Sequence, residues 1–218
     1  GSPLAVGGTV LPTLIAPNSW TGGAAWDKGG DGWGFLPVRL ETYNMYSDKD
    51  ARRAGTCWDV RGTSYTERYQ DTHIWLAKYR PFTKNNKDAG FDNNLNYNNN
   101  YRYYRYAETL LNAAELLLQT GGSSATALDY VNQVRTRAGI DKLTSVNVDD
   151  VLNERHLEFV GEGKRYWDLV RSGKAASMLK PDTYGYRTNT WTEKKKYIPI
   201  AQSELDSDPA LVQNDYNK

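Results

Sequence analysis

The sequence is poor in cysteine and histidine and has no long apolar segment. Its one cysteine, Cys57, cannot close an intramolecular disulfide, so the fold does not depend on one. No segment approaches the roughly 20 apolar residues that a membrane-spanning helix needs. The first residues, from Gly1 to Pro3, have no basic stretch followed by an apolar one and thus carry no export signal. This start predicts either a protein that is not exported or a chain that is part of a longer protein.

The sequence also lacks the signatures of common catalytic and cofactor sites. Its two histidines, His73 and His156, lie far apart and have no partnering cysteine, which argues against a zinc site. It has no glycine-rich phosphate loop, no dinucleotide fingerprint and no nucleophile elbow. We therefore expect no metal, no cofactor and no catalytic residue.

Neither sign of charge is in excess, because 27 basic residues face 26 acidic ones. A net charge of +1 argues against a protein that binds nucleic acid by neutralising phosphates. The segment from Tyr101 to Tyr106 combines tyrosine and arginine, as RNA-stacking surfaces do. Helical spacing instead places Tyr103 and Tyr106 inward, beside leucines. Arg102 and Arg105 would then face solvent, so we expect no nucleic-acid partner.

Tryptophan and tyrosine are abundant, with seven and sixteen residues against four phenylalanines. Rings with a polar edge suit half-hydrated surfaces such as sugar-binding platforms, although a core built on these rings would account for most of them. Trp20, Trp26 and Trp33 lie among glycines, which let the backbone run close to a ligand. An exposed indole stacks on the apolar face of a pyranose. The alternative is that each ring plugs the helical core, and Trp33 is the strongest candidate for a plug because it lies close to Phe35.

Composition and periodicity divide the chain into four regions. Residues 1–34 are an irregular region rich in Gly and Trp, 35–100 mix short elements with an Asn-rich loop, 101–173 form helical hairpins, and 174–218 are an irregular C-terminal segment. Within the second region, Arg39–Tyr46 and Thr72–Tyr79 fit a short helix or a strand equally well. Because strands and helices do not alternate, we predict a mainly α fold with long irregular loops and little β structure.

The helical region carries the clearest signals. Apolar residues at three- and four-residue spacing predict amphipathic helices, with serine or asparagine caps and a glycine stop. Their limits, in chain order, are Arg102–Gln119, Ser123 or Ser124 to Gly139, Asn147 to Val160, and a short helix that ends near Gly173 and carries Trp167 in the core. The first two helices form an antiparallel hairpin of about the length of a tetratricopeptide unit.

Three glutamates, here called the acidic ladder, recur every four positions and share one face of a helix: Glu154, Glu158 and Glu162. We expect them to form ion pairs with three nearby arginines: Arg155, Arg165 and Arg171. An alternative interpretation is the acid/base pair of a glycosidase. Such pairs normally come from different segments that face one cleft, so a structural role is favoured.

Four sets of motifs, in order, resemble the SusD/RagB family of outer-membrane glycan-binding lipoproteins. They are Gly32–Pro37 with Asp50–Arg53, Arg105–Glu115 with Val131–Ile140, the run Asn153–Arg171, and Tyr197–Ile200 through Gln213–Asn214. Together they cover about residues 30–216. Members of this family are usually more than twice as long and have a lipidated N-terminal cysteine. The chain therefore resembles the C-terminal half of a family member.

The resemblance implies glycan binding without catalysis, on a fold of tetratricopeptide-like helical hairpins. Such proteins hold oligosaccharides at the cell surface and cover a SusC-like TonB-dependent outer-membrane transporter that imports them. It also implies an outer-membrane location, through a lipid on an N-terminal Cys that this chain does not contain. The family's sugar platform is built from loop aromatics and polar side chains. In this chain the candidates for carbohydrate binding are Trp20, Trp26 and Asn18.

Two other functions remain alternatives: a tetratricopeptide-like protein-interaction module without sugar affinity, and a carbohydrate-active enzyme. In helical repeat proteins each unit buries its apolar face against a neighbouring unit. We therefore expect the last hairpin to associate with the missing N-terminal half of the same protein, or else to self-associate.

Overall fold

The computed structural model of the protein describes residues 8–21, 32–82, 85, 95–185, 188 and 190–215. Within these residues the protein is mainly α with one two-stranded sheet, as predicted. None of the helices described is both long enough and apolar enough to cross a membrane. The chain divides into two compact units, Gly1–Arg165 and Tyr166–Lys218.

The first unit begins with short elements around a small antiparallel sheet. These are α1 (Leu11–Ile15), α2 (Leu40–Met45), α3 (Ala51–Thr56), β1 (Cys57–Asp59) and β2 (Ile74–Leu76). The Asp50 side chain caps α3 by accepting a hydrogen bond from the Arg52 amide at 3.0 Å. α1 lies in the region 1–34, which the sequence predicts to be irregular. Pro12 at the start of this helix suits the first turn, where a missing amide proton costs nothing.

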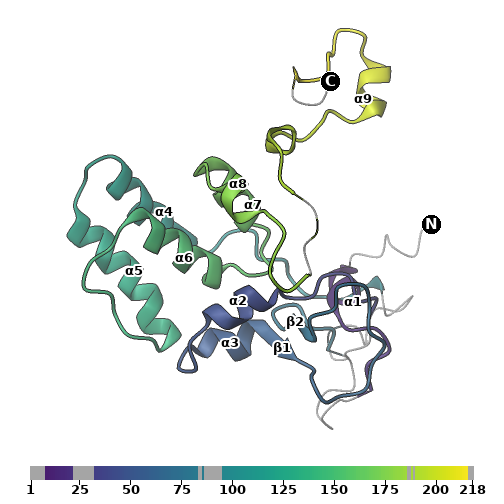
Figure 1. Cartoon of the computed structure of the whole chain (residues 1–218), viewed down its shortest axis with the longest axis horizontal. Helices are drawn as coiled ribbons and strands as arrows, with labels where there is room; N and C mark the ends of the chain where they lie inside the picture. The colour runs from purple at the N-terminus through teal and green to yellow at the C-terminus, as the bar shows by residue number, and fades with distance from the viewer. Residues whose placement is uncertain are drawn as a thin grey trace. The chain divides into compact units, whose positions relative to one another are not determined.

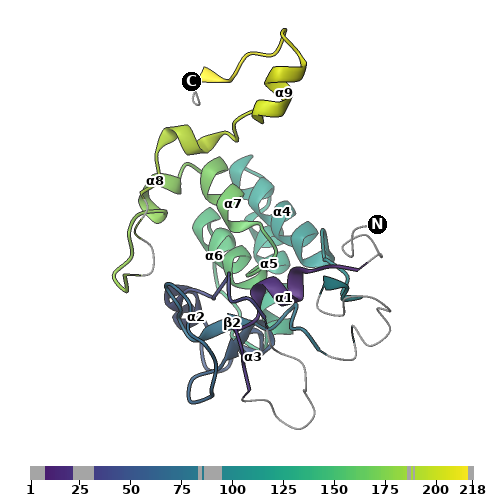
Figure 2. The same cartoon turned by 90° about the vertical axis from the view of Figure 1, so that its right-hand side faces the viewer.

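Three longer helices follow in the first unit: α4 (Tyr106–Gln119), α5 (Ser124–Ala138) and α6 (Val148–Glu158). The first two, α4 and α5, form the helical hairpin. Figure 1 shows α4 and α5 side by side with α6 against α4, and Figure 2 shows the same packing from a second direction. The predicted helix limits are confirmed at three points. Ser123 Oγ accepts from the Thr126 amide at 3.1 Å, and Gly139 ends α5 with a φ of 76°. Asn147 caps α6 and shares a capping box with Asp150.

Three apolar clusters hold the first unit together. The largest side chains of the helical cluster that are fully buried are Leu111, Val131, Val134 and Val151. A second cluster joins α1, α2 and the sheet through Ile15, Tyr46, Ile74 and Tyr79. A third pairs Trp58 with Trp75 across the sheet. Burying one such side chain contributes roughly 1.5–3 kcal/mol. The sheet region and the hairpin therefore each have a core of their own.

The start of α4 differs from the prediction. The helix begins at Tyr106, because Arg105 before it is extended, with φ of −154° and ψ of 163°. Tyr103, which precedes the helix, is 80% exposed rather than buried, and Tyr106, the first helical residue, is 70% exposed. The Arg105 side chain turns inward rather than facing solvent, and it is 24% exposed. Helical periodicity applies only where the backbone is helical, so extending it back before Tyr106 reversed the positions of Tyr103 and Arg105.

Trp33 was the strongest candidate for a core plug, but its side chain is 42% exposed. Its amide donates to the Thr13 carbonyl at 2.7 Å, which holds the backbone next to α1. Gly34 follows with a φ of 71°, a conformation that favours glycine. The Trp33 ring contacts Phe35 edge-on, with ring centroids 6.2 Å apart, and Phe35 is itself exposed. The backbone of this segment is therefore anchored while its rings remain at the surface.

The second unit consists of short helices: α7 (Arg165–Arg171, which begins at the last residue of the first unit), α8 (Ala175–Met178), a 3-10 helix (Glu193–Lys196) and α9 (Gln202–Ser207). The last three lie in the segment 174–218, which the sequence predicts to be irregular. The Gln213 side chain bonds to both the amide and the carbonyl of Ile200, at 3.0 Å each. The Gln213 side chain thereby satisfies the backbone donor and acceptor of Ile200, as a neighbouring strand would in a sheet.

Trp167 was predicted to lie in the core but is 47% exposed. A helix turns by about 100° per residue, so Trp167 lies about 200° around α7 from Leu169. Leu169 is the apolar residue that α7 buries, with 2% exposure. The Trp167 ring instead contacts Tyr166 edge-on, with ring centroids 5.1 Å apart.

Candidate functional site

The acidic ladder is buried at the centre of an ion-pair network. Glu158, only 2% exposed, accepts from Arg52 Nη1 at 3.1 Å and from Arg137 Nη2 at 2.5 Å. Its Oε1 also pairs with Arg105. The three arginines belong to α3, to α5 and to the segment before α4. One carboxylate therefore joins three separate parts of the first unit.

Glu154 and Asp50 extend this network at α3. Arg52 donates to Glu154 Oε1 at 2.6 Å and to Asp50 Oδ2 at 2.7 Å. Arg135 Nη1 donates to the other oxygen of Glu154 at 2.9 Å. Burial alone would lower the pKa of Arg52, but the hydrogen bonds to Asp50 and Glu154 outweigh burial and raise that pKa. The arginine thus stays charged although it is buried.

Glu162 lies at the other end of the network. It accepts from Lys78 Nζ at 2.6 Å and from Arg105 Nε at 2.9 Å. Burial would raise the pKa of Glu162, but these hydrogen bonds outweigh burial and hold the pKa below its ordinary value. Burial lowers the pKa of Lys78, and Glu162 offsets only part of that effect. Because a glycosidase acid needs a raised pKa, Glu162 is poorly suited to that role.

The arginines that the sequence places beside the ladder have other partners. Arg155 Nη1 donates to Asn112 Oδ1 at 2.5 Å, and Arg165 Nη1 donates to the Leu152 carbonyl at 3.2 Å. Arg171 pairs at 2.8 Å with a carboxylate of its own helix, α7. The predicted ion pairing of the ladder is confirmed, but the predicted partners are wrong. The prediction that all three glutamates share one helix is also wrong, because α6 ends at Glu158 and Glu162 lies in the turn after it. The glutamates reach across the interior to other elements.

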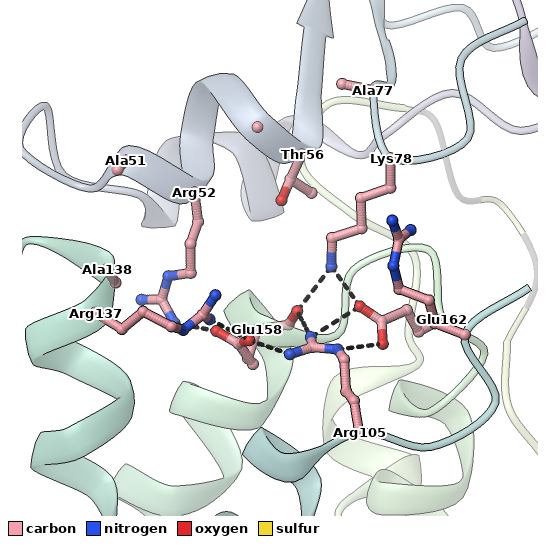
Figure 3. Close-up of a pocket in the computed structure, with 12 residues that line it drawn as sticks. Ala51, Arg52, Thr56, Ala77, Lys78, Arg105, Arg137, Ala138, Glu158 and Glu162 are labelled. Atoms are coloured by element: carbon pink, nitrogen blue, oxygen red, sulfur yellow. Dashed lines mark hydrogen bonds and ion pairs between the residues drawn. The ribbon is translucent and has the colours of Figure 1, made fainter. Parts of the chain in front are cut away.

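A cleft of about 490 Å³ opens beside the network, and we call it the basic cleft. Five cationic side chains line it together with Glu158 and Glu162: Arg52, Lys78, Arg102, Arg105 and Arg137. Figure 3 shows Arg52 and Arg137 converging on Glu158, with Lys78 and Arg105 directed toward Glu162. The residues between them are small, and a methyl group built on Gly55 would meet no atom within 4 Å.

Among the candidates for carbohydrate binding, Trp26 lies outside the described residues. Trp20 is half-buried. Its Nε1 donates to Thr63 Oγ1 at 3.0 Å, and its ring meets Trp58 edge-on with centroids 4.7 Å apart. The Arg80 guanidinium lies 5.2 Å from the Trp20 ring centroid and 3.6 Å from that of Trp58. Trp20 is thus firmly positioned and only partly accessible.

Asn18, the third candidate, ties two loops together. Its Nδ2 donates to the Gly32 carbonyl at 2.8 Å, and its main-chain carbonyl accepts from the Thr66 amide at 2.7 Å. Its Oδ1 accepts a long hydrogen bond of 3.5 Å from Ser19. The structure therefore brings Asn18 and Trp20 together at the loop that joins β1 to β2, where Thr63 and Thr66 lie.

That loop forms a second cleft of about 520 Å³, which we call the loop pocket. It is lined by Val60, Gly62, Thr63, Ser64, Tyr65, Glu67 and His73. The hydrogen bond from Trp20 to Thr63 places the indole next to the wall of this pocket. Hydroxyl, carboxylate and imidazole groups of this kind suit a ligand with many hydroxyls.

The backbone near the loop pocket is unusual. Among the residues described, the non-glycine residues with positive φ are Ser19 at 54°, Gln70 at 58° and His73 at 59°. L-residues adopt this conformation rarely, and such residues concentrate at ligand sites. Ser19 precedes Trp20, and His73 lines the pocket itself. The strain therefore coincides with the candidate site.

Polar side chains in the loop pocket hold one another in place. The Tyr65 hydroxyl lies 2.6 Å from His73 Nδ1 and donates to Asp71 Oδ1 at 3.1 Å. His73 Nε2 lies 3.7 Å from Glu67 Oε1. Burial raises the pKa of Tyr65, and the nearby Asp71 carboxylate raises it further. The phenol therefore remains neutral and keeps its proton for hydrogen bonding.

Sequence reasoning did not single out the residues of this loop. Tyr65 and His73 lie in the pocket wall, and Tyr69, at 84% exposure, is the most exposed large aromatic residue of the segment. The available signal was a polar stretch with Gly62 between two apolar segments, which is typical of a strand-connecting loop.

In the parts of the chain that the structure describes, no cluster of three or more His, Cys, Asp or Glu residues could hold a metal ion.

Comparison with known proteins gives consistent matches along the chain. Surface glycan-binding protein A from Bacteroides uniformis is 66% identical, with a TM-score of 0.86 over 96% of this chain and 47% of that structure. The same-named protein from Bacteroides thetaiotaomicron, in complex with laminarihexaose, is 53% identical, with a TM-score of 0.86 over 98% of this chain and 48% of that structure. SusD-like protein P2 from Formosa agariphila is 30% identical over 88% of this chain and 42% of its own length.

The chain thus spans about half the length of the relatives it matches. The model of the SusD family matches residues 20–216, which include the residues of the loop pocket and of the basic cleft and most of each compact unit. The motifs that resembled this family are confirmed by that match, and the chain belongs to the SusD family.

Proposed function

We propose that this chain is the C-terminal part of a cell-surface protein that binds glucans of the laminarin type without cleaving them. The observation that carries the proposal is the 53% identity, over 98% of this chain, to a structure that holds laminarihexaose. Laminarihexaose is an uncharged glucose oligomer. Its recognition must therefore rest on ring stacking and on hydrogen bonds to hydroxyl groups.

The loop pocket and the adjoining Trp20 offer both kinds of contact. Thr63, Glu67 and His73 supply donors and acceptors, and their positions are set by the hydrogen bonds described above. Tyr69 supplies an exposed ring on the same loop, and Trp20 supplies a second, half-buried ring. Asn18 contributes chiefly by fixing the loop, since its Nδ2 and its carbonyl bond to the backbone.

We propose the same location and partner that the family suggests. The full-length protein would be held at the outer membrane by a lipid on a cysteine outside this chain. It would pass its glycan to a SusC-like TonB-dependent transporter. What supports this part is the family match over residues 20–216.

The test is calorimetric titration of laminarihexaose into wild-type protein and single variants. Tyr69→Ala removes an exposed ring, so it should weaken binding by roughly 1–3 kcal/mol while leaving the melting temperature unchanged. Trp20→Ala should weaken binding and also lower stability, because its ring packs on Trp58. Tyr103→Ala is the matched control. Tyr103 is 80% exposed, close to the value for Tyr69, but it lies in the segment before α4 and not in the loop between β1 and β2. If Tyr69→Ala and Trp20→Ala both bind like the wild type, the loop pocket is not the sugar site.

One observation favours the alternative of a protein-interaction module. Trp33, Phe35 and Leu36 are 42%, 55% and 59% exposed and form a contiguous apolar segment. Absence of heat with laminarihexaose and other neutral oligosaccharides, together with concentration-dependent association in sedimentation, would support that function instead.

A further inference from the structure

The basic cleft carries more positive charge than its carboxylates balance. Five cations of the cleft and the adjoining network form ion pairs with four carboxylates, and a sixth cation, Arg102, lines the cleft without an ion pair to any described residue. The paired cations are Arg52, Lys78, Arg105, Arg135 and Arg137, and the carboxylates are Asp50, Glu154, Glu158 and Glu162. Six positive minus four negative charges leave +2 at a site within a chain whose total charge is only +1. Low-dielectric walls strengthen the field of such an excess.

The carboxylates of the cleft are already saturated. Glu158 Oε1 pairs with Arg105 and Arg137, and its Oε2 accepts from Arg52. Glu162 Oε1 accepts from Lys78 and Arg105, and its Oε2 accepts from Arg105. They therefore have little capacity left to neutralise a further cation.

Three of the cations, in contrast, have N–H groups that form no hydrogen bond in the described part of the chain. The Arg102 guanidinium makes no ion pair or hydrogen bond within the part of the chain that the structure describes, and only lies 5.8 Å from the Tyr79 ring. Arg137 uses Nη2 alone and its side chain is 59% exposed. Lys78 has three N–H donors, of which two bond to Glu158 and Glu162. These three residues line one cleft.

We propose that the basic cleft binds an oxyanion, a sulfate or phosphate group, either free or carried on a larger molecule. Tetrahedral oxyanions present several acceptor oxygens and negative charge at once, which matches two guanidinium forks and an ammonium. The volume of about 490 Å³ admits such a group with room for an attached sugar. The small residues Ala51, Gly55 and Ala77 leave this space open. This site is distinct from the loop pocket, and its ligand is charged whereas laminarihexaose is not.

The test is isothermal titration of the wild-type chain with sodium sulfate, sodium phosphate and glucose 6-phosphate, with sodium chloride at matched ionic strength and glucose as reference ligands. Sulfate also stabilises proteins in a general, non-saturating way, so a saturable isotherm is the required readout. Saturation by the free ions alone identifies a site for inorganic anions. Tighter binding of glucose 6-phosphate identifies a site for an anionic group on a sugar. Either result supports the proposal.

Variants then locate the site. Arg102→Gln breaks no side-chain bond in the described part of the chain, so it should fold normally and weaken anion binding at least about tenfold, the loss expected for one charge-assisted contact. Adding Arg137→Gln should abolish measurable saturation. Lys142→Gln, which removes an exposed charge in the loop between α5 and α6, is the matched control and should bind like the wild type. The proposal is overturned if no probe saturates, or if the Arg102→Gln protein binds the anion as tightly as the wild type.

Discussion

Replacing Glu158 by glutamine tests whether the ion-pair network stabilises the first unit. The substitution keeps the shape of the side chain but removes the charge that three arginines share. Arg52 and Arg105 would keep their other carboxylate partners, Glu154 and Glu162, while remaining partly desolvated. Removing one partner from a buried ion pair typically costs about 3–5 kcal/mol, and here it leaves the buried network with one negative charge fewer against the same arginines. We expect Glu158→Gln to destabilise the protein by that amount.

Urea unfolding followed by tryptophan fluorescence measures this change, because Trp58 and Trp75 are buried in the first unit. With an m-value of roughly 2–3 kcal/mol/M, the midpoint should fall by about 1–2 M without a change in slope. Arg137→Gln should shift the midpoint much less, since the Arg137 side chain is 59% exposed and can be solvated. Asp48→Asn, at the 98% exposed partner of Arg53, is the control and should have little effect. Equal midpoints for Glu158→Gln and Asp48→Asn would refute the stabilising role of the network.

Three further predictions follow from the core and the network. Because the folded-state pKa of Glu162 is depressed, its contribution to stability is present above its unfolded pKa of about 4.3 and is lost as pH falls through the lower folded value. Acid titration followed by circular dichroism should therefore show a loss of stability below about pH 4, and Glu162→Gln should reduce it. Burial raises the pKa of Cys57 to about 12. Its thiol should thus react with Ellman's reagent at pH 8 only after denaturation. Gly161→Ala places a methyl group 2.4 Å from Leu76 Cδ2, so it should cost about 1–3 kcal/mol more in urea unfolding than Gly121→Ala, where φ is similar and nothing lies within 4 Å.

The sequence predicted the hairpin well, because helix limits are set by nearby residues. Ser123, Gly139 and Asn147 act through hydrogen bonds or backbone conformations within a few positions of themselves. The same logic failed at Arg105. There the backbone is extended, and a long-range pairing with Glu158 decides where the side chain lies.

The spacing of residues along the sequence could not predict the partners of the acidic ladder. The spacing of the glutamates placed Glu154 and Glu158 correctly on one face of α6, but it did not show which element that face meets. Arg52 and Lys78 lie 106 and 84 residues from the glutamates they contact. The loop pocket escaped prediction for a related reason. Trp20 and Thr63 are 43 residues apart, and backbone hydrogen bonds from the Thr66 amide to the Asn18 carbonyl and from the Thr21 amide to the Ser64 carbonyl hold their segments together.

The long reach of the ion-pair network also bears on the order in which the first unit folds. Arg52 and Glu158 meet only after a loop of more than a hundred residues has closed, whereas α4 and α5 contact each other across a short turn. Loop closure must precede any gain from contacts of this range, so we expect the hairpin to form first and the buried charges to be desolvated near the end. Interactions absent from the transition state slow unfolding without speeding folding. We therefore expect the network at Glu158 to slow unfolding and so to lengthen the lifetime of the native state.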